Sequence, residues 1–291
     1  MDGSVESGKE AWFVTSTGAK LFYRDFVPAR PASSVPLLCL HGFMRNSRDF
    51  CDLGRTFAAK GVRVVAPDLR GRGFSTRYSD PKDYHYDLVM RDVKDLLDHL
   101  DIGPVAVLGV ALGGIIAMDM AGESGTRVSG IVLNDLGAEV VEQSAKRMAD
   151  NVDASDFSFD EAVDRVKLHF GKTYPDLSED RWVDLMLRAY RELTPGRYAR
   201  DFDLRSLVDA QRMKAERPDL WPQFLATRGV PVALLRGETS DFFTADCAER
   251  MVEAHADTVL TTVKGRGHPP LLDEPESLAA IEALLQRASQ R

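Results

Sequence analysis

The sequence is poor in cysteine and has no long hydrophobic run. Its three cysteines, Cys39, Cys51 and Cys247, form an odd set without C-x-x-C spacing, so neither a disulfide framework nor a zinc site is predicted. No segment approaches the roughly 20 apolar residues that a membrane-spanning helix needs. Residues 1–6 also lack the basic and apolar regions of a secretion signal. These absences predict a cytoplasmic protein with no membrane partner.

A surplus of positive charge is lacking too. The chain has 37 lysines and arginines against 45 aspartates and glutamates, which gives a formal net charge of -8 and a pI near 5.3. Such an average field repels nucleic-acid phosphates, so we predict no nucleic-acid partner. The 291 residues are 44% hydrophobic and 28% charged, which is typical of a globular core domain that carries an insertion. A homodimer is compatible with this composition.

Apolar runs alternate with helical repeats along much of the chain. Eight runs are predicted to be strands, and they cover residues 12–14, 21–23, 35–40, 62–66, 105–108, 128–133, 231–235 and 259–263. A helix is predicted between Leu88 and Leu100, where apolar residues recur on one helical face. This alternation predicts a parallel sheet with right-handed crossovers.

Residues 137–228 break the alternation. They contain charged helical segments with scattered aromatic residues and no convincing strand, so we expect an all-helical insertion between two strands of the sheet. Each aromatic residue can either pack in the core of the insertion or contact a ligand. Packing is the more ordinary use, because aromatic side chains bury preferentially.

The stretch from Leu108 to Gly114 joins an apolar strand to an apolar helix by a sharp turn. In so tight a turn the residues two before and two after the centre have to be small, and here they are Gly109 and Gly113. The central side chain is then forced outward at the carboxyl end of the sheet. That central residue is Ala111, which has no lone pair with which to attack a substrate.

Three explanations of Ala111 are open from the turn alone. It can replace a serine, as a deliberate change that stops turnover while substrate binding is kept. The chain can be a natural binding protein on an enzyme scaffold. The stretch can also be a glycine-rich turn with no chemical meaning.

A histidine and two aspartates lie where later strands end. Asp241 follows the strand at 231–235, and His268 follows the strand at 259–263. Position 111, Asp241 and His268 therefore come in the order nucleophile, acid, base, with 27 residues between the acid and the base. Asp135 is an alternative acid, because it lies at the tip of the strand that follows the turn. Asp241 is preferred only slightly, and Glu238 is a weaker third candidate.

These motifs together resemble the α/β-hydrolase superfamily, in its capped, cofactor-independent branch of esterases, lactonases and carbon–carbon hydrolases. The resemblance runs from Leu21 to Leu285 and departs from the G-x-S-x-G motif only at Ala111. It implies an α/β fold with a mostly parallel eight-stranded sheet, helices on both faces and a helical cap. Residues 1–136 and 229–291 would form the core domain, and residues 137–228 the cap domain.

The resemblance also assigns roles in two loops that follow buried strands. The H-G pair at His41 begins an oxyanion loop, so the amides of Phe43 and Leu112 would hold the developing oxyanion, with Met44 beside them. His41 itself is more simply explained as a structural histidine bonded to loop backbone. The D-x-R-G-x-G-x-S stretch brings Arg70 near the pocket, either to contact an acidic substrate or, more ordinarily, to pair with Asp68 or backbone carbonyls.

The implied reaction of a serine-bearing form is the hydrolysis of a small organic ester or lactone, or of the C–C bond of a ketone. His268, oriented by an aspartate, would take the hydroxyl proton, and no metal or organic cofactor would be required. Other classes stay open on the same fold. A haloalkane- or epoxide-opening enzyme would need Asp at position 111, a cofactor-free dioxygenase would use His268 alone, and a ligand-binding receptor would need no nucleophile.

Overall fold

The computed structural model describes residues 8–33, 35–139, 141, 152, 155–217 and 219–290. Its centre is an eight-stranded sheet in the order β1-β2-β4-β3-β5-β6-β9-β10. The strands are β1 Lys9–Val14, β2 Lys20–Phe26, β3 Leu37–Leu40, β4 Val64–Pro67, β5 Val105–Val110, β6 Val128–Asn134, β9 Val232–Gly237 and β10 Thr258–Val263. β1 and β2 are antiparallel to their neighbours, and every other pairing in the sheet is parallel. The predicted strands and the predicted sheet type are confirmed.

The middle of the sheet is buried on both faces. Every residue of β3, β4 and β6 is buried, which explains why these strands are nearly continuous apolar runs. Parallel strands bring their carboxyl ends to one edge, so the loops after β3, β4, β5, β6 and β9 meet there. That edge is where the candidate site is built.

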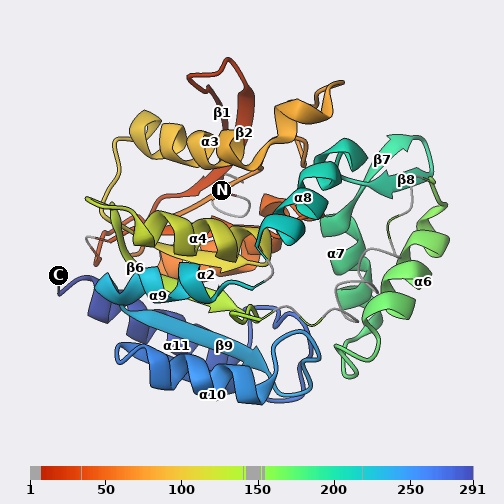
Figure 1. Cartoon of the computed structure of the whole chain (residues 1–291). Coiled ribbons are helices and arrows are strands. Elements are labelled where there is room, and N and C mark those ends of the chain that lie inside the picture. Colours follow the sequence, from red (N-terminus) through yellow and green to blue (C-terminus); the bar gives the residue numbers. More distant parts are fainter. Residues whose placement is uncertain are drawn as a thin grey trace.

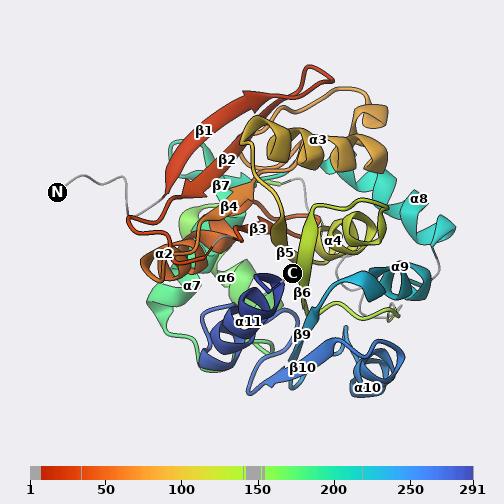
Figure 2. The ribbon, with the colours of Figure 1, turned by 90° about the vertical axis from the view of Figure 1, so that its left-hand side faces the viewer.

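Helices cover both faces of the sheet (Figures 1 and 2). One apolar layer joins the sheet to α3 Tyr86–His99, α4 Leu112–Gly122 and α10 Ala245–Ala254. The other joins it to α2 Cys51–Ala59 and α11 Pro275–Ala288. Short 3-10 helices lie at Ser47–Phe50 (η1), Pro81–Tyr84 (η2), Leu204–Leu207 (η3) and Thr227–Gly229 (η4). No helix in the described ranges is long and apolar enough to span a bilayer.

The insertion lies beside the sheet and carries its own small core (Figure 1). It contains the helices α6 Phe159–Phe170, α7 Glu179–Ala189 and α8 Val208–Glu216. Trp182 and Tyr190 pack in this core, and Phe157, Phe159, Phe170 and Tyr198 pack against it. For these residues the packing interpretation is confirmed.

The expectation of an insertion without strands is wrong. β7 Tyr190–Thr194 and β8 Arg197–Arg200 form an antiparallel hairpin at the end of α7. The turn of the hairpin is Pro195-Gly196. Sequence reasoning missed the two strands because their charged residues break the apolar alternation that is typical of a half-buried strand. The hairpin is mostly solvent-facing, so it needs few apolar side chains.

The last helix before β9 packs with the core. α9 Trp221–Ala226 lies against α4, where Ala226 approaches Gly122 so closely that a Cβ on Gly122 would lie 2.8 Å from the Ala226 Cβ. Figure 2 shows the two helices side by side. A cap that ends at residue 228 includes this helix, so the boundary between core and cap stays a prediction at this end.

Candidate active site

The turn between β5 and α4 holds Ala111 in a backbone conformation that alanine rarely adopts. Its φ is 46° and its ψ is -111°, and it is the N-cap residue of α4. Non-glycine residues in such regions cost about 1–3 kcal/mol and persist where the surrounding structure imposes them. The side chain of Ala111 offers no cap hydrogen bond, so the first amides of the helix lack a partner from that side chain.

Two glycines make this turn sterically possible. A Cβ on Gly109 would lie 2.3 Å from the backbone carbonyl of Gly113, and a Cβ on Gly113 would lie 2.0 Å from the carbonyl oxygen of Leu40. Both distances are far below van der Waals contact, so no larger residue fits at either position. The small-residue requirement predicted from the sequence is therefore confirmed, and the glycine-rich turn is a tightly packed elbow.

His268 lies in the loop after β10 and is hydrogen-bonded to Asp135. Its Nδ1 is 2.8 Å from Asp135 Oδ2, and both side chains are buried. Its other ring nitrogen, Nε2, has no hydrogen-bond partner within the described part of the chain. The Phe242 ring stacks on the imidazole with centroids 4.1 Å apart and planes 15° apart. An imidazole held in this way keeps one nitrogen for proton transfer.

The preference for Asp241 as the partner of His268 requires correction. Asp241 lies in the bend after β9 and is exposed, whereas Asp135 follows β6 and is fully buried with a φ of 55°. Asp135 accepts two further hydrogen bonds, from the Gly237 amide at 2.7 Å and from the Ser240 hydroxyl at 2.5 Å. Three donors thus fix the carboxylate that faces the imidazole.

Ser240 was not identified from the sequence. Its hydroxyl donates to Asp135 and accepts from the amides of Phe242 and Phe243 at 3.2 and 3.1 Å. The hydroxyl therefore joins the loop that carries the stacked ring to the carboxylate that is bonded to His268. The signal available was position alone, since Ser240 follows β9 at the edge where Asp241 was expected to act.

His41 is a structural histidine, as predicted. Its Nε2 accepts from the Leu69 amide at 3.0 Å, so its proton lies on Nδ1 and is donated to the Gly42 carbonyl at 2.8 Å. Complete burial lowers the pKa of the imidazole to about 3. The ring is neutral at physiological pH and ties the loop after β3 to the loop after β4.

The two expected oxyanion residues are brought together. Phe43 and Leu112 line one narrow cavity, and a Cβ on Gly42 would lie 3.6 Å from the Ala111 Cβ. The loop after β3 therefore lies against the elbow, as an oxyanion pocket requires. Met44 is half-buried in the same loop, and its place beside the substrate stays a prediction.

Arg70 does not face the pocket, and its expected pairing with Asp68 is also wrong. The buried guanidinium forms two hydrogen bonds with Asp92 of α3, at 2.6 and 2.7 Å, and one with the Asp83 carbonyl at 2.5 Å. Asp68 instead accepts from the amides of Ser47 and Phe74. Arg70 is thus a structural residue, and its bond to a backbone carbonyl is the part of the expectation that is confirmed.

Arg72, two residues later, lines the cavity in its place. The sequence motif contains it, but nothing in the pattern separates it from Arg70. It is 1% exposed. Its Nε donates to the backbone carbonyl of Phe43 at 3.0 Å, and its Nη1 donates to that of Arg70 at 2.8 Å.

The cavity that Arg72 lines has a volume of about 10 Å³, which is room for one water. A larger hollow of about 320 Å³ at Glu192–Pro195 is an open depression at the hairpin turn, and none of its lining residues belongs to the candidate site.

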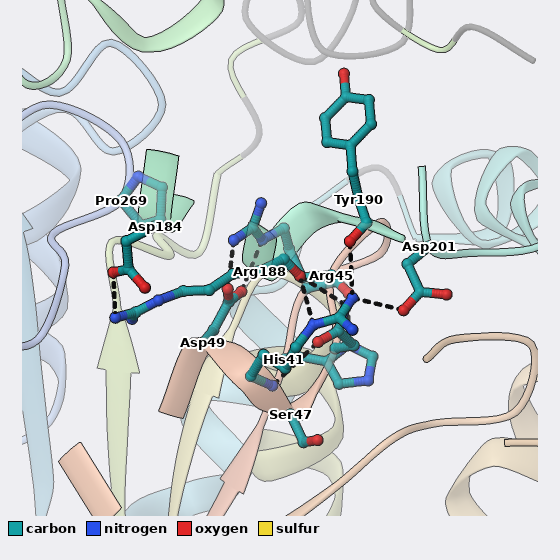
Figure 3. Close-up of polar contacts among 12 residues, drawn as sticks. His41, Arg45, Ser47, Asp49, Asp184, Arg188, Tyr190, Asp201 and Pro269 are labelled. Atoms are coloured by element: carbon teal, nitrogen blue, oxygen red, sulfur yellow. Dashed lines mark hydrogen bonds and ion pairs between the residues drawn. The ribbon is translucent and has the colours of Figure 1, made fainter. Parts of the chain in front are cut away.

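The insertion is fastened to the loops that form the site. The buried Asp201, next to β8, pairs with Arg77 of the loop after β4 and with Arg48 of η1. In Figure 3, dashed lines mark the hydrogen bonds that Asp201 and the Tyr190 carbonyl accept from the Arg48 guanidinium. On the other side, the Tyr174 hydroxyl donates to the Pro269 carbonyl at 2.6 Å, directly beside His268. Burial raises the pKa of Tyr174, so the phenol keeps the proton that it donates.

Most of the chain matches one protein family. Residues 37–281 match the alpha/beta hydrolase family. The chain belongs to the α/β-hydrolase family. The match includes the elbow, the loop after β3, Asp135 and His268, so the site described above lies in the part of the chain that the family shares.

Among its relatives is a 3-hydroxybutyrate-oligomer hydrolase from Cupriavidus necator, which is 26% identical over 86% of this chain and 87% of its own. An α/β-hydrolase structure from Novosphingobium aromaticivorans is 34% identical, with a TM-score of 0.85, and covers 97% of this chain and 99% of that chain. A thermophilic esterase from Thermogutta terrifontis is 21% identical, with a TM-score of 0.66, over 97% of this chain and all of its own. The last comparison concerns the fold alone.

Proposed function

We propose that this α/β-hydrolase binds a small organic ester or lactone beneath the inserted cap, and that Ala111 alone prevents it from hydrolysing that ligand. The observation that carries the proposal is the bonded pair of His268 and Asp135 at the sheet edge where the strained elbow presents residue 111. A buried imidazole with a fixed Nδ1, and with an Nε2 that has no partner among the described residues, is arranged to take a proton from a neighbouring hydroxyl.

The steps follow from these groups once a serine stands at position 111. His268 Nε2 takes the hydroxyl proton, and the serine oxygen attacks the substrate carbonyl. The amides of Phe43 and Leu112 stabilise the oxyanion, and the imidazolium returns its proton to the leaving alcohol. Water then attacks the acyl-enzyme by the same route. Asp135 holds the imidazole in the tautomer that these reaction steps need.

The relatives support an ester as the substrate class. One hydrolyses oligomers of 3-hydroxybutyrate by name, and oligomers of a hydroxy acid are joined by ester bonds. The elbow supports the loss of a nucleophile, since a strained backbone at a residue without a functional group has no evident use in the present chain.

The test is the variant Ala111→Ser, assayed with 4-nitrophenyl esters, lactones and a 1,3-diketone. We expect turnover of an ester or lactone and a covalent acyl-enzyme in the mass spectrum. The matched control, Ala111→Ser combined with His268→Gln, should lose both. The unchanged chain should bind the same ligand in calorimetry without releasing product.

A folded Ala111→Ser protein that turns over none of these substrates would contradict the proposal. Binding by the unchanged chain together with an inert serine variant would indicate a binding protein on a hydrolase fold. Oxygen consumption that depends on His268 and is independent of the serine would indicate a dioxygenase.

A further inference from the structure

Arg70 and Arg72 are two buried arginines in one loop, and their charges are balanced differently. Arg70 is paired with the carboxylate of Asp92. Arg72 donates to two backbone carbonyls, which carry no formal charge, and it forms no ion pair within the described ranges of the chain. Its remaining nitrogen, Nη2, has no hydrogen-bond partner there. Burying a cation without an ion pair is costly, and burial lowers the pKa of Arg72 to about 10 while the charge of Asp203 opposes part of the shift.

The polar groups around Arg72 are already occupied. Of the acidic residues near it, Asp209 is paired with Arg212 at 2.7 Å, and Asp203 accepts from the Tyr84 hydroxyl at 2.7 Å and from Arg205. The Ser206 hydroxyl donates to the Asp203 carbonyl at 2.6 Å. Among the described side chains of the cavity wall, the guanidinium is therefore a donor with capacity left.

The position of Arg72 connects this charge to the site. Phe43 and Leu112, whose amides are the proposed oxyanion donors, line the same cavity. Arg72 bonds the carbonyl of Phe43 directly, so a group bound to the guanidinium would lie near the scissile carbonyl. The opposite wall comes from the insertion, where Arg72 forms an isolated bridge with Phe202 and Met213 of α8 faces the cavity.

We propose that Arg72 binds a carboxylate of the ligand, so that the chain takes esters carrying a free acid group in preference to neutral esters. This inference rests on the proposed function, because it names the class of substrate for the same site. A carboxylate would supply a directly bonded counter-charge and would occupy Nη2 in a charge-assisted hydrogen bond. Because the cavity holds only about one water as it stands, the carboxylate enters with a displacement of the α8 wall.

The first experiment uses the unchanged chain and does not depend on turnover. Glutarate and its dimethyl ester are titrated in a calorimeter against the protein and against Arg72→Gln. We expect the protein to bind glutarate in preference to the diester and Arg72→Gln to lose about 10- to 100-fold in affinity for glutarate. Arg127→Gln is the matched control for net charge, since it lies before β6 at the opposite end of the strands, and it should bind glutarate unchanged.

The second experiment separates charge recognition from loop support. In the Ala111→Ser background, mono-4-nitrophenyl glutarate and its methyl ester differ in one negative charge and release the same nitrophenolate. Arg72→Gln should lower kcat/KM for the acid about 10- to 100-fold more than for the ester, and Arg72→Lys should recover part of the difference. If Arg72→Gln does not fold, the Arg72→Lys variant and the preference of the parent for the acid decide the matter.

Equal losses on both substrates would overturn the inference, because Arg72 would then only support the loop of Phe43. Glutarate binding that is the same in Arg72→Gln would overturn it as well. An inert Ala111→Ser protein that still binds glutarate through Arg72 would contradict the proposed hydrolysis and leave the carboxylate site standing.

Discussion

His41 and His268 follow two strands of the same sheet, and both are buried, yet their surroundings give them opposite roles. Both ring nitrogens of His41 are occupied by backbone groups of two loops. His268 has one nitrogen bonded to Asp135 and the other without a partner among the described residues. The comparison teaches that burial alone does not prepare a histidine for proton transfer. The arrangement suited to that role has a carboxylate on one nitrogen and leaves the other nitrogen available.

The largest effect that tests this comparison is the loss of the carboxylate. In the Ala111→Ser protein, Asp135→Asn should lower kcat by about three to four orders of magnitude, because an amide leaves His268 in the wrong tautomer. Initial-rate or stopped-flow assays with a 4-nitrophenyl ester measure kcat directly. Asp241→Asn is the control and should cost far less, since Asp241 is exposed. A larger loss from Asp241→Asn would return the acid role to that residue.

His41 should affect the stability of the fold and not the rate of catalysis. Its pKa is about 3 in the folded chain and 6.5 in an unfolded one, so between these values the unfolded state binds a proton that the folded state does not. The stability that His41 contributes is complete above pH 6.5 and falls as the pH drops toward 3, by at most about 5 kcal/mol. Urea unfolding from pH 6.5 to pH 4 should show a shallower loss for His41→Asn than for the parent. Parallel pH profiles of the two proteins would refute this assignment.

The hydroxyl of Ser240 should have an intermediate effect. It donates to Asp135 at 2.5 Å and accepts from two amides, so Ser240→Ala removes one bond to the carboxylate and leaves two donors unpaired. A hydrogen bond to a charged group contributes about 1.5–3 kcal/mol, so kcat in the Ala111→Ser background should fall by about tenfold or somewhat more. Ser240→Thr keeps the hydroxyl and should retain most of the rate. A loss in the threonine variant as large as in the alanine variant would mean that packing, and not the hydrogen bond, matters at this position.

The contrast between the two histidines also marks how far sequence reasoning reached. The strands were predicted from apolar runs, and the elbow from the spacing of Gly109 and Gly113, because both depend on local sterics and on burial. The choice between Asp135 and Asp241 depends on which carboxylate is buried against His268, and this is set by a loop geometry that no local pattern encodes. The same holds for Arg70 and Arg72, because only the packing of α3 shows that Asp92 lies against Arg70 and not against Arg72.

The smallest effect is expected from the Phe242 ring. This ring stacks on His268, and the described contacts of His41 include no such ring. The ring lies parallel to the imidazole at 4.1 Å, so its face is turned toward the charge that forms when His268 accepts the proton. Such a contact contributes about 0.5–1 kcal/mol near a surface. In the Ala111→Ser background, Phe242→Leu should therefore lower kcat by about two- to fivefold and leave KM nearly unchanged, because the imidazolium forms after substrate binding. Phe242→Tyr keeps the ring face and serves as the matched control, with an expected rate close to that of the parent. A rise in KM at constant kcat in Phe242→Leu would show instead that the ring contacts the substrate, and the stack on His268 would then have no part in stabilising the protonated base.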